Sequence, residues 1–538
     1  MNVEEFPWWT KEQRQLAREV EEFSREVAPL VEEADWRAKL GMLDGSLPWD
    51  SIPQELKKRM VEKGYFGAMI PKEYGGMGLG ATGSCIIAEG LGPAYGSFVS
   101  TAIGGTHQII RHGTKEQKER WLPKIASGEI SGAIGLTEPF VGSDAAGVET
   151  FAVREGDEYV INGKKRFVTN LGYADLYIVY IKTSEKPEDK AAYRHMTALI
   201  VEKGTPGFTV EKVNMLCTLD PPQLNGYLNF DDVRVPVANR IGEENDAFLG
   251  VMVDGLNFER LMICALTLGF MRISLKYAVY ATERRIQFGK RTIDFESNQY
   301  RIADMITNLK LARLMTYYSA YLADLGQEPI IEATLIKIFA AEANSKAALD
   351  AMQCMGGDGL TKMYPVESIM RNMLMNVIGA GSSDIMKRLL VRQATRYQVG
   401  LMLEDLELPR RRLHPELGVP VSDWRGELKP KLTAKDPEGR VLEALALDYK
   451  VNPGLYMTRE DLEEDTDLKG EELDKVLMSL EEKRLVKLFR LHGVIRLAKA
   501  LYTGLKKVKP QKFYSWYPPW VKEKLFPAPQ MKPMFETK

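Results

Sequence analysis

The spacing of apolar residues changes twice along the chain, from a helical period to a period of two and back. At the start, apolar residues recur every three or four positions from Leu16 to Leu30, behind a Thr-x-x-Gln capping box at Thr10. Between Ile134 and Val235, short alternating apolar runs bounded by polar turns predict strands. After Gly242, long amphipathic stretches favour a helical bundle, with helices predicted at 248–280, 300–325 and 330–355.

Two segments within the predicted strand region carry candidate chemistry. The first, GLTEPFVGSD at 135–144, is a loop of small residues with exposed hydroxyls. The second, NGKKRFVTN at 162–170, is predicted to open with a hairpin turn at Asn162-Gly163 and to continue as a strand. Together they offer backbone amides to a flat heterocycle, with short hydroxyls and one aromatic ring from Thr137, Ser143, Thr169 and Phe167.

The composition changes after Pro409. Arginine and proline residues between 409 and 436 predict a linker. Three short helical patterns follow, one of them capped by Thr458, and then a hairpin centred on His492-Gly493; this order resembles a winged helix. The residues from Lys506 onward form an aromatic and proline-rich tail.

A winged helix would suggest DNA binding, but its candidate recognition helix at 471–482 is rich in acidic residues, which opposes contact with phosphate groups. The sequence therefore favours protein docking or oligomer contacts for this extension, with a structural cover as the other alternative. We expect no nucleic acid partner.

The remaining composition is typical of an ordinary globular protein. A length of 538 residues implies at least two domains, and a formal net charge of −2 gives no indication of an anionic partner. We expect no signal peptide and no apolar run long enough to span a bilayer. We also expect no metal site, because the five histidines lack ligand spacing. Free, mostly buried thiols in a reducing cytoplasm are expected for the four separated cysteines, Cys85, Cys217, Cys264 and Cys354.

The paired loop and strand motifs closely resemble the flavin-binding signature of the acyl-CoA dehydrogenases. The resemblance extends over roughly Trp9 to Leu401 and includes further motifs, namely PKEYGG at 71–76, RIQFG at 285–289, QCMGGDG at 353–359, MRN at 370–372 and GAGSSD at 379–384. It implies an FAD-dependent enzyme of fatty acid or organic acid degradation that dehydrogenates an acyl-CoA thioester to the 2-enoyl-CoA. It also implies an electron-transfer flavoprotein as acceptor and assembly as a homodimer or homotetramer.

The expected fold class is α+β multidomain, with helical regions on both sides of a central β-barrel and a winged-helix-like extension. The predicted boundaries are 1–132 for the N-terminal helical domain, 133–242 for the β-barrel, 243–408 for a four-helix bundle, 409–436 for the linker, 437–505 for the winged-helix-like domain and 506–538 for the tail.

The resemblance also implies the position of the catalytic base. Many members carry a glutamate in the last motif, where this chain has Ala380. The branch similar to isovaleryl- and long-chain-acyl-CoA dehydrogenases carries it in a Glu-Arg-Leu motif, here at Glu259. Such a base works best when burial raises its pKa toward neutrality. The alternative is that Glu259 interacts only with a helix dipole.

Other residues follow from the same resemblance. The backbone amide of Ala380 would polarise the thioester carbonyl, and Asn257 and Arg260 would contact the substrate. FAD contacts are expected from Thr137, Ser143, Phe167, Thr169, Ser382 and Asp384. A neighbouring subunit's FAD is expected to contact Arg285, Phe288, Gln353 and Gly357, with Arg285 suited to pyrophosphate. The alternative for this second group is a charged helix end with a glycine-rich cap.

A function from another class also remains open. A protein of this fold can keep a flavin without turnover and act in binding or regulation, with nucleic-acid contact through the extension as one form of that role. A flavin that is bleached by an acyl-CoA would favour the enzyme.

Overall fold

The computed structural model describes residues 5–39, 54–92, 104–171, 174–213, 225–396, 409–414, 420–491 and 493–508. The chain divides into two compact units, Met1–Val399 and Gly400–Lys538, and each has a hydrophobic core of its own. The first unit contains helices, then a sheet, then long helices, which is the order that the sequence predicts.

The first helical region begins where the sequence predicts it. The Thr10 hydroxyl accepts a hydrogen bond from the Gln13 backbone at 3.1 Å, and the Gln13 side chain accepts one from the Thr10 amide at 3.0 Å. Thr114 and Gln117 form the same reciprocal cap. The described helices here are α1 (Lys11–Lys39), α3 (Gln54–Glu62), α4 (Gly80–Leu91), α6 (Thr106–His112) and α7 (Lys115–Ala126).

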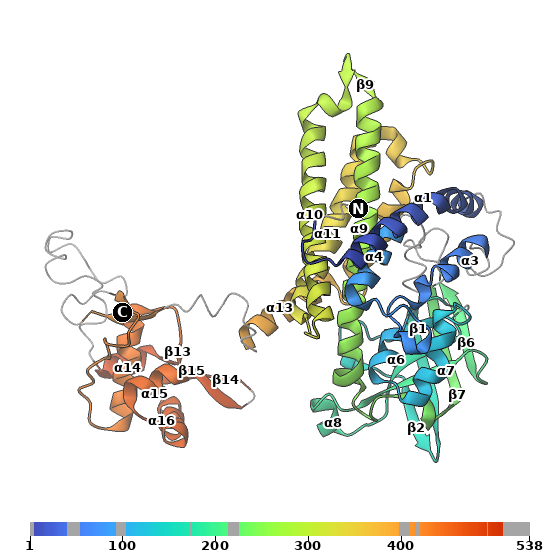
Figure 1. Cartoon of the computed structure of the whole chain (residues 1–538). Coiled ribbons are helices and arrows are strands. Elements are labelled where there is room, and N and C mark those ends of the chain that lie inside the picture. Colours follow the sequence, from blue (N-terminus) through green and yellow to red (C-terminus); the bar gives the residue numbers. More distant parts are fainter. Residues whose placement is uncertain are drawn as a thin grey trace. The chain divides into compact units, whose positions relative to one another are not determined.

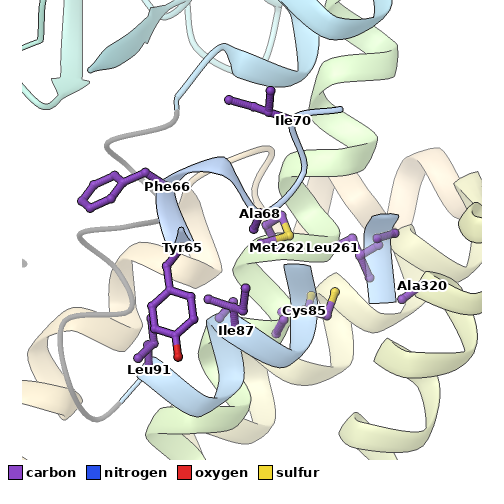
Figure 2. Packing of buried hydrophobic residues seen from close by; sticks show 14 of the residues in the cluster. Tyr65, Phe66, Ala68, Ile70, Cys85, Ile87, Leu91, Leu261, Met262 and Ala320 are labelled. Atoms are coloured by element: carbon purple, nitrogen blue, oxygen red, sulfur yellow. The ribbon is translucent and has the colours of Figure 1, made fainter. Parts of the chain in front are cut away.

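Helix α4 lies at the centre of the helical core and is buried along almost its whole length. Figure 2 shows Cys85 and Ile87 of this helix among buried residues, with Leu261 and Met262 drawn nearby. Three cysteines, Cys85, Cys264 and Cys354, are free and buried, whereas Cys217 lies outside the described residues.

The middle region is an eight-stranded sheet in the order β6-β7-β3-β2-β4-β5-β8, with β1 paired in parallel to β4. Most other neighbours run antiparallel. Its strands are β1 (Gly132–Gly135), β2 (Phe151–Glu155), β3 (Glu158–Thr169), β4 (Leu176–Lys182), β5 (Met196–Glu202), β6 (Phe208–Val213), β7 (Asn225–Pro236) and β8 (Arg240–Ile241).

Strand β4 is buried on both faces, which explains its continuous apolar sequence. Ile178 and Tyr180 face the helical core, whereas Tyr177 and Val179 pack with inward residues of β3, β5 and β7. The sheet therefore encloses a core of its own, as a barrel does, and its other face is covered by helices.

One local prediction is wrong: Asn162-Gly163 is not a hairpin turn. Strand β3 continues through both residues, and the turn between β2 and β3 lies at Gly156-Asp157, where Gly156 has a φ of 63°. Asn162 instead exchanges two hydrogen bonds with Asp232, each 2.9 Å long, beside an irregularity in the β3–β7 register. Glycine is needed at 163 because a Cβ there would lie 2.7 Å from Thr150.

The long helices after the sheet lie alongside one another (Figure 1). A turn of π-helix at Ala247–Met252 precedes α9 (Val253–Arg284), and a small hairpin of β9 (Ile286–Gln287) and β10 (Lys290–Arg291) leads into the next helix. The remaining helices are α10 (Glu296–Asp324), α11 (Ile330–Met355), α12 (Val366–Ile378) and α13 (Ser383–Arg396).

The segment Ala247–Arg284 is long and apolar enough to cross a membrane, with a mean hydropathy of 1.4 over its most apolar window. The sequence prediction that no apolar run reaches this length is therefore wrong. Of that window, 61% is buried inside the protein, which is the behaviour of a core helix. Its apolar residues thus pack against other helices of the first unit.

The second unit has a core formed by helices and a three-stranded sheet in the order β13-β15-β14. Thr458 caps its helix, as predicted, by accepting a hydrogen bond from the Asp461 amide at 3.1 Å. The winged-helix interpretation stays a prediction. The elements are β11 (Arg410–Leu413), β12 (Pro420–Asp423), α14 (Pro437–Val451), β13 (Met457–Thr458), α15 (Arg459–Thr466), α16 (Gly470–Glu482), β14 (Val486–Leu491), β15 (Val494–Ala500) and α17 (Tyr502–Val508).

The region predicted to be a linker is partly ordered. Strands β11 and β12 pair within it, and Arg410 and Arg412 both form ion pairs with Asp465, at 2.6 and 2.5 Å. In the sequence, the consecutive arginines predict a linker. In the structure, Arg412 is buried, because Asp465 supplies its counter-charge.

Candidate active site

The loop at 135–144 and strand β3 are directly joined. The amide of Arg166 donates a hydrogen bond to the carbonyl of Thr137 at 2.8 Å. The Lys165 ammonium lies 2.7 Å from Glu138. Glu138 also accepts hydrogen bonds from the amides of Glu149 and Thr150, at 2.6 and 3.0 Å. The two motifs that the sequence paired therefore form one hydrogen-bonded structure.

The Lys165–Glu138 pair is completely enclosed in the sheet domain. Burial lowers the pKa of Lys165 to about 8, although the charge of Glu138 acts in the opposite direction. Burial alone would raise the pKa of Glu138, but Lys165 and the backbone donors hold it below its ordinary value. Both groups are therefore charged at neutral pH, and each compensates the other.

Phe167 lies at a bulge in β3, where the register with β7 shifts between Arg166 and Val168. Its φ is 56°, and its ring is 44% exposed with the Arg166 guanidinium 4.7 Å from the ring centroid. A bulky residue in this conformation indicates local strain, and such strain is concentrated at ligand sites. The bulge presents the ring outward, between the partly buried Arg166 and the buried Val168.

The other predicted flavin residues of this region surround the same structure. Thr169 donates a hydrogen bond from its hydroxyl to Asn225 at 3.0 Å. Thr137 is partly buried, and Ser143 is exposed on the loop. Their hydroxyls and the Phe167 ring are chemically suited to hold the hydrogen-bonding and aromatic parts of a flavin.

Glu259 lies in the second turn of α9 and is partly buried. Burial raises the pKa of its carboxyl group, and the neighbouring Arg260 acts in the opposite direction. Burial also raises the pKa of Tyr180 on β4, and the charge of Glu259 adds to that rise. The Tyr180 carbonyl accepts a hydrogen bond from Lys165, whose ammonium also pairs with Glu138 of the 135–144 loop.

Arg260 connects the first turns of α9 to the loop between α12 and α13. Its guanidinium donates to the Asn257 side chain at 2.8 Å and to the Ala380 carbonyl at 3.2 Å. Ala380 has a φ of 51°, which is uncommon for a residue with a Cβ. Nearby, the Ser382 hydroxyl accepts a hydrogen bond from the Ile385 amide at 3.3 Å, and Asp384 is exposed at the start of α13.

The remaining predicted residues gather at the far end of α9. Arg285 donates to the Met355 carbonyl at 3.3 Å and lies 3.6 Å from Asp358, beside the exposed Gly357. Gln353 accepts a hydrogen bond from Arg301 at 2.8 Å. Phe288 is 93% exposed at the tip of the β9–β10 hairpin (Figure 1), with a φ of 52°.

This second group cannot belong to the same site as Glu259 within one chain. Glu259 and Arg285 are separated by one continuous helix, and a rise of 1.5 Å per residue puts them about 39 Å apart. The structure thus brings the predicted residues together as two groups at opposite ends of α9.

Sequence reasoning missed several charged residues of the site. Lys165 is buried on β3, four and six residues after the buried Ile161 and Tyr159, and this even spacing was the available signal. Lys337 of α11 is a lone lysine on a buried helix face, and it donates to the Gly381 carbonyl at 2.7 Å.

Two of the five histidines, for which the sequence predicts no metal site, contact one carboxylate. His107 and His112 lie 3.3 and 2.8 Å from Asp254, and the His107 ring stacks on Phe258. These residues are distant in sequence, so spacing gave no signal. Across the described residues, no group of three or more His, Cys, Asp or Glu could hold a metal ion.

Comparison with known proteins identifies the class that this fold and site define. Family models of the acyl-CoA dehydrogenases match in all three parts: the N-terminal domain at residues 10–129, the middle domain at 133–233 and the C-terminal domain at 249–395. The chain belongs to the acyl-CoA dehydrogenase family, and it is therefore an FAD-dependent oxidoreductase that acts on acyl-CoA thioesters.

Individual relatives agree with this assignment. An acyl-CoA dehydrogenase of Bacillus subtilis is 35% identical over 402 residues, covering 73% of this chain and 99% of the relative. The mitochondrial isovaleryl-CoA dehydrogenase of Pongo abelii is 34% identical over 400 residues, covering 72% and 89%. A chain in the solved structure of the electron transferring flavoprotein of Acidaminococcus fermentans has a TM-score of 0.66 at 32% identity, covering 73% and 100%.

Proposed function

We propose that Glu259 is the base of an FAD-dependent α,β-dehydrogenation that converts an acyl-CoA to the 2-enoyl-CoA. The observation that carries this proposal is the partly buried Glu259 carboxyl group, whose pKa is raised by burial, beside Arg260, which holds the Ala380 loop. A carboxylate with a raised pKa is a stronger base for an α proton than an exposed one.

The surrounding residues have separate roles in this proposal. The Glu259 carboxylate accepts the α proton, and the Ala380 amide donates a hydrogen bond to the thioester oxygen as negative charge develops on it. Arg260 donates hydrogen bonds to the Ala380 carbonyl and to Asn257, so it orients the loop. Both Arg260 and Asn257 are assigned to contact the substrate. The β hydrogen leaves with its electron pair as the Cα–Cβ double bond forms.

FAD binding is assigned to the two groups at the ends of α9. When bound, FAD accepts the β hydrogen as a hydride. Phe167 would supply an aromatic face for the flavin ring, and side-chain and backbone groups of Thr137, Ser143, Thr169, Ser382 and Asp384 would contact the cofactor. The second group would hold the FAD of a neighbouring subunit; its members are Arg285, Phe288, Gln353 and Gly357. This group lies too far along α9 from Glu259 to contact the same FAD molecule.

This arrangement requires a homodimer or homotetramer. The proposed electron acceptor is an electron-transfer flavoprotein, supported by the similarity to a chain in the Acidaminococcus fermentans structure. We place the protein in the cytoplasm, a reducing compartment that suits the three described free cysteines.

The direct test is anaerobic titration of the FAD-loaded protein with a panel of CoA thioesters that vary in length, branching and ring content. At least one thioester should bleach the flavin absorbance. Glu259→Gln should keep FAD and bind the same thioester but lose flavin reduction by several orders of magnitude. A wild-type flavin that ignores every thioester would favour a non-catalytic flavoprotein, and near-normal reduction in Glu259→Gln would refute the assigned base.

A further inference from the structure

The loop that carries Ala380 is held in an unusual conformation by two cations. Ala380 and Gly381 both have positive φ, at 51° and 92°. The carbonyl of Ala380 accepts a hydrogen bond from Arg260 at 3.2 Å, and the next carbonyl, of Gly381, accepts one from Lys337 at 2.7 Å. On the other side, the Gly379 amide donates to the Met375 carbonyl at the end of α12.

These contacts anchor the backbone on both sides of the Ala380 amide. The Ala380 carbonyl is held by Arg260, and the Gly379 amide is held by the Met375 carbonyl. Left-handed backbone in a residue with a Cβ costs about 1–3 kcal/mol and persists only where its surroundings impose it. The Ala380 amide itself makes no hydrogen bond to another of the described residues, so it is available to a ligand.

Lys337 is a buried lysine, and a buried lysine is unfavourable for stability if its role is purely structural. Its side chain is 1% exposed, and the described ion pairs include no carboxylate partner for it. Burial lowers its pKa to about 8, and the nearby Arg260 adds to that decrease. A buried cation in such a place is destabilising, and an apolar side chain would fill the same volume at lower cost.

We propose that Lys337 is a positioning residue that, together with Arg260, aims the Ala380 amide at the thioester oxygen. It also brings a second positive charge toward the loop where negative charge develops during proton removal. Donors fixed in advance in a water-poor site stabilise such charge more than mobile ones do. This inference rests on the proposed function, in which the Ala380 amide binds that oxygen.

The test compares three substitutions at one position with a matched control. Lys337→Met removes the donor and the charge, Lys337→Gln keeps a donor without charge, and Lys337→Arg keeps both. The control is Lys346→Met on the same helix, where the lysine is half-exposed and pairs with Asp304 and Asp350. The measurements are flavin reduction at saturating thioester, the thioester Kd, and the long-wavelength band formed with acetoacetyl-CoA, which enolises but is not dehydrogenated.

We expect Lys337→Met to reduce flavin about ten- to a hundredfold more slowly with little change in Kd, and to lose the enolate band. Lys337→Gln should be intermediate, Lys337→Arg should recover part of the rate, and Lys346→Met should match the wild type. An unchanged band and rate in Lys337→Met would overturn the proposal, as would an equal loss in Lys346→Met or unfolding of both Lys337→Met and Lys337→Gln. If the wild-type protein gave neither a band nor reduction, the proposed function itself would fail.

Discussion

The Lys165 ammonium lies 2.7 Å from the Glu138 carboxylate, with both side chains buried inside the sheet domain. Glu138 belongs to the loop that carries Thr137, and Lys165 belongs to the strand that carries Phe167 and Thr169. One ion pair therefore fixes the relative position of the two segments to which we assign the flavin. Removing either charge should affect the fold and the cofactor together.

Lys165→Met should destabilise the protein by about 3–5 kcal/mol, because Glu138 would remain buried without a counter-charge. FAD content should fall with it. Denaturant unfolding and flavin absorbance measure the two effects. The matched control is Lys164→Met, which breaks an exposed pair with Glu211 and should cost less than about 1 kcal/mol. Equal losses in the two variants would contradict the prediction.

The substitution of the other partner, Glu138→Gln, should change the stability of the protein by an amount that depends on pH. Burial already lowers the pKa of Lys165 to about 8, and losing Glu138 removes the main opposing influence, so the pKa should fall further. A folded pKa below the unfolded value makes the protein least stable where Lys165 is charged, so stability should rise as pH increases toward about 10.4, the ordinary lysine value. Unfolding midpoints at pH 7 and 9, relative to the wild type, would show this; a constant difference would refute it.

Glu259→Gln should not lower stability at pH 7. Burial raises the folded pKa of Glu259 above its unfolded value, so its contribution to stability is present below the unfolded pKa and is lost as pH rises through the folded pKa. The substitution should therefore raise Tm at pH 7, and the difference should shrink near pH 4. Thermal unfolding at both values checks this, with the exposed Glu283→Gln on the same helix as control. A large drop in Tm would indicate a structural role.

The larger elements could be predicted from the sequence because their apolar patterns repeat over many residues. The three helices after the sheet agree with the apolar spacing to within several residues at their ends, and the capping residues Thr10 and Thr458 act as predicted. Asn162-Gly163 failed because the local signal for a turn was outweighed by the tertiary contact with Asp232.

The candidate site was predictable only in part. A resemblance supplied Glu259 and Ala380, but it gave no reason to single out Lys337 or Lys165. Both lysines lie on faces that are otherwise apolar, and their partners, the carbonyl of Gly381 and the carboxylate of Glu138, come from other parts of the chain. No pattern within one segment encodes such a contact, because it forms only when the segments pack.

Arg285 provides a test of assembly. If it holds the FAD of a neighbouring subunit, Arg285→Ala should release FAD from an assembled protein, and the wild type should be at least a dimer. The adjacent Arg284→Ala is the control, since Arg284 is exposed at the same helix end and contacts Tyr280 and Glu283. Flavin retention after gel filtration and mass by light scattering measure both properties. A flavin-loaded monomeric wild type would exclude the shared site.

The second unit should be separable from the first. Its core, from Val441 to Leu505, is formed entirely by residues of that unit, and all proposed catalytic and FAD-binding groups lie in the first. A chain ending at Val399 should keep FAD and reduce it with substrate, yet show altered assembly or slower transfer of electrons to its acceptor. Flavin content, bleaching, oligomer size and acceptor turnover, compared with the full chain, measure these outcomes.

The isolated second unit, 400–538, distinguishes the roles of the extension. It should fold alone and bind duplex DNA no better than a neutral control protein, because helix α16 has Glu471 and Glu472 in its first turn and ends with Glu481 and Glu482. The hairpin beside it exposes Phe489 and Val494, which suit contact with a protein surface. Loss of FAD from the chain ending at Val399 would make the extension part of the dehydrogenase fold. Tight, salt-sensitive binding of duplex DNA by the isolated unit would assign it to nucleic acid instead.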